Sequence, residues 1–177
     1  MIWFSSFSVD NWLTVISLLF VITAGIFGYI QWVKANRIKR AEFVHQIFER
    51  LRSDEDIASV MYLIDYGSVW YNESFHDGEN GFERKVDTLL SFLSYICYLK
   101  KKHILTASEL RILEYDIRRA CESVDVQNYL WNLHHFSRKN GVECSFSYLV
   151  QYGIDNKLFR NGFNNPASNA YPKYLNF

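Results

Sequence analysis

The sequence predicts an all-α protein in which one N-terminal transmembrane helix continues into a cytoplasmic bundle of about five helices. Residues 11–33 form a charge-free run between Asp10 and Lys34. The only prolines, Pro166 and Pro172, lie near the end, which leaves a long proline-free stretch. Apolar residues recur at three- and four-residue steps through most of that stretch, as the buried face of a helix requires.

The charge-free run is long enough to cross a bilayer. At about 1.5 Å per residue it forms a helix of roughly 35 Å, against a hydrocarbon core of about 30 Å. A cleaved signal peptide would need a basic segment before the run and a small-residue cleavage site after it, and the sequence has neither. A buried helix of a soluble protein is the remaining alternative, but such helices are usually shorter.

Basic residues follow the run and none precede it. Because cytoplasmic flanks are enriched in Lys and Arg, we expect the N-terminus outside and the C-terminus in the cytoplasm of a bacterial inner membrane. The same cations could also hold anionic lipid headgroups, although setting the topology is a sufficient role for them. They are Lys34, Arg37, Lys39 and Arg40.

The predicted organisation has four parts. Residues 1–10 form a short extracytoplasmic N-terminus and residues 11–33 the span. Residues 34–155 form one cytoplasmic helical domain, and residues 156–177 an irregular tail rich in aromatic residues and Asn. The tail has no helical periodicity, so it either covers the bundle or is disordered.

Capping signals place the helices of the domain in order. From Ala35 the helix is expected to continue out of the bilayer to about Leu51, so that the span and the first cytoplasmic helix form one rod. Residues 53–56 start the next helix, which stops near Gly67, and the irregular segment 68–81 follows.

The second half of the domain shows the same kind of signals. A long helix covers 82–101, and a capping box at Thr106 and Glu109 opens another that runs to about Glu122. Residues 123–125 start the next helix, and a short one covers about 147–154. In the helix after 125 we expect four residues to face the core: Tyr129, Leu130, Leu133 and Phe136.

Composition excludes some functions. With 19 basic and 19 acidic residues the chain is neutral, which argues against nucleic acid as a partner. The cysteines Cys97, Cys121 and Cys144 are odd in number and lie on the predicted cytoplasmic side, so we expect buried thiols and no disulfide.

No catalytic or cofactor motif is present, so we expect no enzyme activity and no cofactor. The weak metal or acid–base candidates are His76, Asp77 and Glu79 in segment 68–81, where polar residues are also common turn formers. The adjacent His134 and His135 point about 100° apart on a helix, so we expect one in the core and one in water.

Four charged residues predict a buried polar network that fixes the helix register, with a ligand site for carboxylates as the alternative. Asp87 lies near an apolar stripe, where burial requires a cation or several hydrogen bonds, and Arg84 and Arg118 are the candidate partners. The network residues are Asp65, Asp87, Glu114 and Arg118.

Small residues recur along one face of the predicted span. Such a stripe permits close approach of two helices in lipid, which predicts a homo-oligomer or a second membrane protein as partner. Small residues are also simply common in spans. The stripe consists of Thr14, Ser17, Val21, Ala24 and Gly28.

Several short elements over residues 10–153 resemble an uncharacterised bacterial family of small single-span membrane proteins, a domain of unknown function. The resemblance implies fold and topology and supplies no catalytic residues. The elements are Arg40-Ala-Glu-Phe43, Ser53-Asp-Glu-Asp56, Tyr62-Leu-Ile-Asp-Tyr-Gly67, Phe75-His76, Asp87-Thr-Leu-Leu-Ser-Phe92, Ile96-Cys-Tyr-Leu99 and Val126-Gln-x-Tyr-Leu130.

Two functions fit these observations. The first is a membrane-anchored cytoplasmic module without catalytic activity that binds a cytoplasmic protein or relays a signal. The second is an oligomeric effector of a bacterial defence or toxin system that disrupts the membrane, which rests on similarity of architecture alone.

Overall fold

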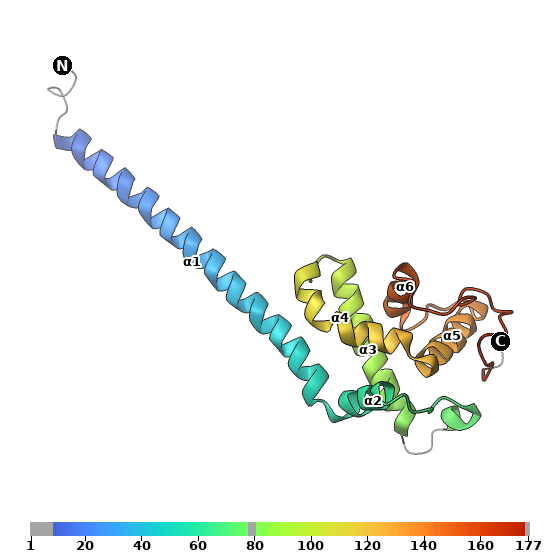
Figure 1. Ribbon diagram of the computed structural model, residues 1–177. Helices are drawn as coiled ribbons and strands as arrows, with labels where there is room; N and C mark the ends of the chain where they lie inside the picture. Colours follow the sequence, from blue (N-terminus) through green and yellow to red (C-terminus); the bar gives the residue numbers. More distant parts are fainter. Residues whose placement is uncertain (1–8, 78–80, 176–177) are drawn as a thin grey trace. The chain divides into compact units, whose positions relative to one another are not determined.

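A computed structural model describes residues 9–77 and 81–175 (Figure 1), and within them the chain is helical and has no strand. The predicted all-α class is therefore confirmed. The elements are α1 (Val9–Ser53), α2 (Glu55–Asp65), the 3₁₀ turn η1 (Glu73–Asp77), α3 (Phe82–Lys101), α4 (Ala107–Glu122), α5 (Val124–Lys139) and α6 (Ser147–Asp155).

Helix α1 runs through the predicted span and the helix after it without a break. It has 45 residues, and its most apolar stretch has a mean hydropathy of 2.3 with no buried residue. By length and composition, this helix could cross a membrane. The chain divides into two compact units, Met1–Ile47 and Phe48–Phe177, so the division falls within α1.

Side-chain caps start α2 and α4 where the sequence predicts them. Asp54 accepts hydrogen bonds from the backbone N–H groups of Asp56 (3.1 Å) and Ile57 (3.3 Å) at the start of α2. At the start of α4 the Thr106 hydroxyl accepts from the Glu109 N–H (3.3 Å), and the Glu109 carboxylate accepts from the Thr106 N–H (2.8 Å). This reciprocal pair is the predicted capping box.

Helix α3 is the centre of the second unit. It packs against α2, α4, α6 and η1, and Leu89, Leu90, Leu93 and Ile96 are fully buried along it. Burial of a side chain of this kind contributes about 1.5–3 kcal/mol, so α3 supplies much of the stability of the unit. Cys97, Cys121 and Cys144 are buried free thiols.

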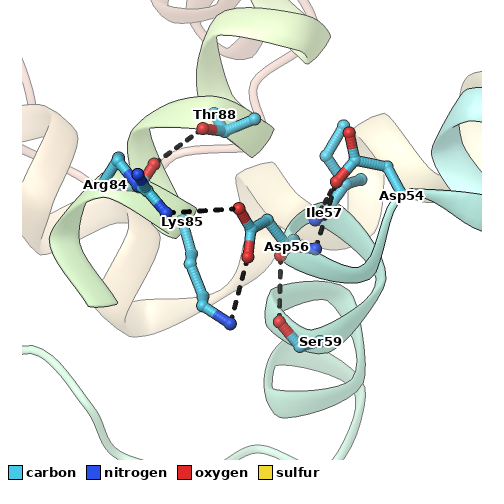
Figure 2. Close-up of polar contacts among 7 residues, drawn as sticks. All are labelled: Asp54, Asp56, Ile57, Ser59, Arg84, Lys85 and Thr88. Carbon is cyan, nitrogen blue, oxygen red and sulfur yellow. Dashed lines mark hydrogen bonds and ion pairs between the residues drawn. The ribbon is translucent and has the colours of Figure 1, made fainter. Parts of the chain in front are cut away.

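Ion pairs join α2 to the first turn of α3. The Asp56 carboxylate lies 3.1 Å from Lys85 Nζ and 3.9 Å from an Arg84 guanidinium nitrogen (Figure 2). The same figure shows the Asp54 cap and the Thr88 hydroxyl, which donates to the Arg84 carbonyl oxygen at 2.8 Å. The Asp56 carboxylate therefore lies at the positive N-terminal end of α2 and also links α2 to α3 through its ion pairs.

The buried face of α5 is wider than the apolar pattern predicts. Tyr129 and Leu130 are buried as expected, but Leu133 is only partly buried and Phe136 is 39% exposed. Besides Asp125, four polar side chains of α5 are buried instead: Gln127, Asn128, Asn132 and His135. The apolar pattern fails here because the covering surface is polar backbone.

That surface is the irregular C-terminal tail, residues 156–175. Asn132 donates to the carbonyl oxygens of Asn128 (2.9 Å) and Pro172 (2.8 Å) and accepts from the N–H groups of Tyr174 (3.0 Å) and Leu175 (3.3 Å). The tail therefore lies against the polar side of α5, and its backbone groups are paired by side chains of that helix.

Arg160 is a second attachment of the tail to α5. Its backbone N–H and its Nε both donate to Gln127 Oε1 at 3.0 Å, and its guanidinium also donates to Asn128 Oδ1. The guanidinium lies 4.6 Å from the ring centre of Tyr171, whose hydroxyl donates to the Arg160 carbonyl oxygen at 2.9 Å.

Candidate functional site

The segment between α2 and α3 is held against α5 by one buried carboxylate. Asp125 Oδ2 accepts from the backbone N–H groups of Trp70 (2.6 Å) and Tyr71 (3.2 Å). The sequence suggested that Asp125 helps to start α5, and its side chain instead orders a chain segment more than 50 positions earlier. Trp70, Tyr71 and Phe75 are buried as a result.

A polar cluster follows on η1 and α3. His76 Nδ1 lies 2.8 Å from Glu83 Oε1, and His76 Nε2 lies 3.2 Å from the Tyr71 hydroxyl. Burial raises the pKa of Tyr71, so its hydroxyl keeps its proton and donates. Glu83 accepts, which assigns the proton of a neutral His76 ring to Nδ1.

Asp87, one turn after Glu83, has a separate partner. The Tyr129 hydroxyl donates to Asp87 Oδ1 at 2.6 Å, and the rings of Tyr129 and Tyr71 meet edge to face with their centres 5.3 Å apart. Burial raises the pKa of the Asp87 carboxyl, and the hydrogen bond from Tyr129 offsets part of that rise.

Asp87 also borders an open groove of about 400 Å³ between the last turn of α1 and the first part of α3. The Arg50 guanidinium lies 5.3 Å from the ring centre of Phe92 in this groove. The lining residues are Arg50, Arg84, Asp87, Thr88, Ser91, Phe92 and Tyr95.

The groove has the chemistry of an anion-recognition surface. Two guanidinium groups provide charged donors that suit a carboxylate or a phosphate, and three hydroxyl-bearing residues, Thr88, Ser91 and Tyr95, belong to the same lining. Asp87 is the one carboxyl group of the lining, and its Oδ1 accepts the hydrogen bond from Tyr129. The aromatic rings of Phe92 and Tyr95 supply an apolar wall.

The predicted metal candidates do not meet as a described site. Glu79 lies outside the described residues, and the side chain of Asp77 does too. Both ring nitrogens of His76 are engaged by Glu83 and Tyr71. Among the residues that the structure describes, no three His, Cys, Asp or Glu side chains are placed to hold a metal ion.

The four residues of the predicted polar network lie apart. Asp65 accepts from Arg119 Nε at 3.2 Å, Asp87 from Tyr129, and Arg118 lies 3.5 Å from Glu122 in an exposed pair of α4. The predicted Arg84 or Arg118 partner of Asp87 is replaced by a tyrosine hydroxyl, because α5 brings Tyr129 to α3.

Glu114, the fourth of these residues, is half-buried on α4. Burial raises the pKa of Tyr152 to about 12, and the charge of Glu114 adds to this rise. A neighbouring carboxyl group that forms a long-range ion pair is Asp116, which is buried and lies 3.2 Å from Arg52. Sequence spacing did not suggest this ion pair, because Arg52 and Asp116 belong to different helices.

The two sets of residues predicted on the span and its flank both lie on α1. The stripe residues are exposed, and the Ser17 hydroxyl donates to the Thr14 carbonyl oxygen at 2.9 Å within the helix. The basic residues Lys34, Arg37, Lys39 and Arg40 are exposed about two to three turns further along.

Neither histidine of the adjacent pair faces water. His135 is buried and its Nε2 lies 2.8 Å from the Phe163 carbonyl oxygen of the tail. His134 is partly buried, and its shielded Nε2 has no hydrogen-bond partner among the described residues. Burial lowers the pKa of His134 to about 4, and the charge of His135 adds to the effect.

Sequence reasoning missed the amides that bind the tail. The signal that could have found them is the run Gln127, Asn128 and Asn132 beside His135 on a helix with few charges. Amide side chains are common on the exposed face of a helix. Where apolar residues surround them, they indicate a polar surface packed against the helix.

No family model, curated protein or solved structure matches this chain. Its resemblance to an uncharacterised family stays a prediction.

Proposed function

We propose that this chain is a membrane-anchored helical module that binds an acidic segment of a partner protein, without catalysis of its own. The observation that carries the proposal is α1, in which an exposed apolar run of transmembrane length continues as one helix into a compact helical unit. A soluble protein would bury such a run, and a membrane-anchored protein exposes it to lipid.

The placement of charges supports an orientation for the anchor. Lys34, Arg37, Lys39 and Arg40 follow the apolar run, and no basic residue precedes it. We propose a single-pass protein of a bacterial inner membrane with its N-terminus outside and its helical unit in the cytoplasm.

Two measurements test the anchor. Membranes that contain the full chain are washed with alkaline carbonate, and reporters active on only one side of the membrane are fused after residue 177. Retention in the pellet with cytoplasmic reporter activity supports the proposal. Release by carbonate would overturn the anchor, and periplasmic activity would overturn the orientation.

The groove beside Asp87 is the proposed partner site. The polar residues next to it are hydrogen-bonded within the unit, His76 to Tyr71 and Glu83, and Asp87 to Tyr129. Such a cluster holds the wall of the groove in place. Arg50 and Arg84 are exposed beside it, and Arg84 also lies 3.9 Å from the Asp56 carboxylate.

Binding of a synthetic Glu-rich peptide to the detergent-solubilised full chain tests the groove. Titration calorimetry with R50Q/R84Q should show binding weakened by at least tenfold, because each charge-assisted hydrogen bond contributes roughly 1.5–3 kcal/mol. The control R118Q removes an equally charged exposed side chain on α4 and should bind as the unaltered protein does. Equal loss in both proteins would show that the groove is not the site.

The exposed stripe on α1 favours the effector as a second candidate. An effector that assembles through this stripe should depolarise cells on overexpression. Depolarisation that is abolished by Gly28→Ile would favour the effector over the interaction module, and a normal membrane potential would remove it.

A further inference from the structure

The turn between α3 and α4 carries a concentrated positive charge that the partner groove does not use. Three consecutive lysines, Lys100, Lys101 and Lys102, are followed by the exposed His103, and the next residue, Ile104, is 48% exposed. We name residues 100–104 the basic turn. His103 has a left-handed backbone (φ 57°), which turns the chain sharply after α3.

Each lysine of the basic turn lies over a tyrosine ring. The distances from Nζ to the ring centre are 4.7 Å for Lys100 and Tyr152, 5.4 Å for Lys101 and Tyr148, and 5.9 Å for Lys102 and Tyr98. Tyr98 and Tyr148 also pack edge to face, with their ring centres 5.0 Å apart. The long side chains are therefore partly ordered before any ligand binds, which reduces the entropy cost of binding.

The lysines retain their charge for an external anion. No ion pair joins any of the three to a carboxylate in residues 9–77 and 81–175. An open pocket of about 410 Å³ beside the basic turn is lined by Lys100, Lys101 and Asp155, and the Asp155 carboxylate accepts a hydrogen bond from Gln151 at 2.6 Å. One carboxylate against two ammonium groups leaves this lining positive.

We propose that the basic turn binds the phosphate groups of anionic lipid headgroups. The charge complements an anionic membrane surface, and an exposed isoleucine beside tyrosines is suited to the interface between headgroups and acyl chains. The inference rests on the proposed anchor, since a tethered unit meets headgroups at high effective concentration. It differs from the partner groove in position and in ligand.

Hydrogen–deuterium exchange of the full chain in lipid nanodiscs tests the basic turn. Nanodiscs of phosphatidylcholine alone are compared with nanodiscs that contain one quarter phosphatidylglycerol. In the anionic discs, exchange of the amides in residues 98–106 should slow by about fivefold or more, the factor that a single lysine near such a surface contributes. High salt should remove the difference.

The variant K100Q/K101Q/K102Q should lose this protection. The matched control R111Q/R138Q/K139Q removes the same net charge elsewhere on the unit and should keep it. Protection that is equal in both kinds of disc, absent from both, or lost equally in the two variants would overturn the proposal. Protection by inorganic phosphate in neutral discs would assign the turn to a soluble phosphate ligand and overturn the lipid.

Failure of the anchor gives a different result from failure of the basic turn. A chain that does not enter nanodiscs contradicts the anchor before exchange is measured. A chain that enters them and shows no dependence on anionic lipid contradicts only the headgroup site.

Discussion

At the scale of single residues, Asn132 is the main link between α5 and the tail. It is fully buried and makes four hydrogen bonds, three of them to the tail backbone. Replacement by alanine leaves buried backbone groups without partners, so we expect Asn132→Ala to lower the free energy of unfolding by about 2–3 kcal/mol. Urea unfolding followed by tryptophan fluorescence measures the change.

The matched control is Asn140→Ala. Asn140 is exposed on the C-terminal end of α5 and donates only to the Phe136 carbonyl oxygen at 2.8 Å. Its loss should change stability by less than about 0.5 kcal/mol. Equal effects at the two positions would mean that the tail contributes nothing to the stability of α5.

His134 predicts the direction of a pH dependence. Its folded pKa of about 4 lies below the usual value of 6.5, so between these values the unfolded chain binds more protons. The stability contribution of a neutral His134 is therefore present above pH 6.5 and is lost as the pH falls towards 4. Asp87 and Asp116 act in the opposite sense, since a raised carboxyl pKa favours the folded state at low pH and this gain is lost as the pH rises.

We expect His134→Leu to be more stabilising at pH 5 than at pH 7.5, by about 1–2 kcal/mol after allowance for its partial exposure. Thermal unfolding of the two proteins at both pH values provides the measurement. If the difference in stability between the two proteins is the same at both pH values, the pKa of His134 does not differ between the folded and the unfolded state.

At the scale of single elements, two helix starts form a natural comparison. Thr106 caps α4 through its side chain, whereas Ser123 begins α5 with no side-chain cap. We expect Thr106→Ala to cost about 1 kcal/mol and Ser123→Ala close to zero. Urea midpoints of the two variants decide the matter, and an equal cost would contradict the described caps.

Helix α6 meets the tail at Gly153. A Cβ atom at this position would meet the ring of Phe159, so the tail must shift to admit a side chain. We expect Gly153→Ala to destabilise the unit by about 1–3 kcal/mol. In the double variant Gly153→Ala/Phe159→Ala the added cost of the methyl group should vanish, and additive losses would show that the two positions do not touch.

The sequence predicts the elements of this protein well and the α5 face poorly. Periodicity and capping residues are local signals, and they locate α3 and α4 at their observed bounds. The buried face of α5 depends on a tail that joins it from 40 positions later, and no local pattern reports that contact. The same reason explains why Asp87 pairs with Tyr129 rather than with an arginine.

At the scale of the whole molecule, the exposed stripe of α1 predicts self-association in lipid. We expect Gly28→Ile and Ala24→Ile to reduce dimerisation of the span in a membrane two-hybrid assay by severalfold, because both place bulk where two helices would approach. Phe27→Ile, on the other face, is the control. Unchanged association of all three variants would show that the stripe is not an interface.

The residues of the partner groove could be predicted only in part. Segment 68–81 stands out in the sequence as an irregular stretch, and its cluster with α3 does border the groove. Arg50 and Arg84 come from different helices, and only the packed unit brings them to one surface.

The clamp of the tail on α5 also sets an order of events during synthesis. Pro172, Tyr174 and Leu175 are synthesised about 40 residues after Asn132, so the Asn132 amide stays without these partners until the growing chain has passed them. A chain released before that point would expose the Asn132 amide on α5, which gives cellular proteases a way to recognise it.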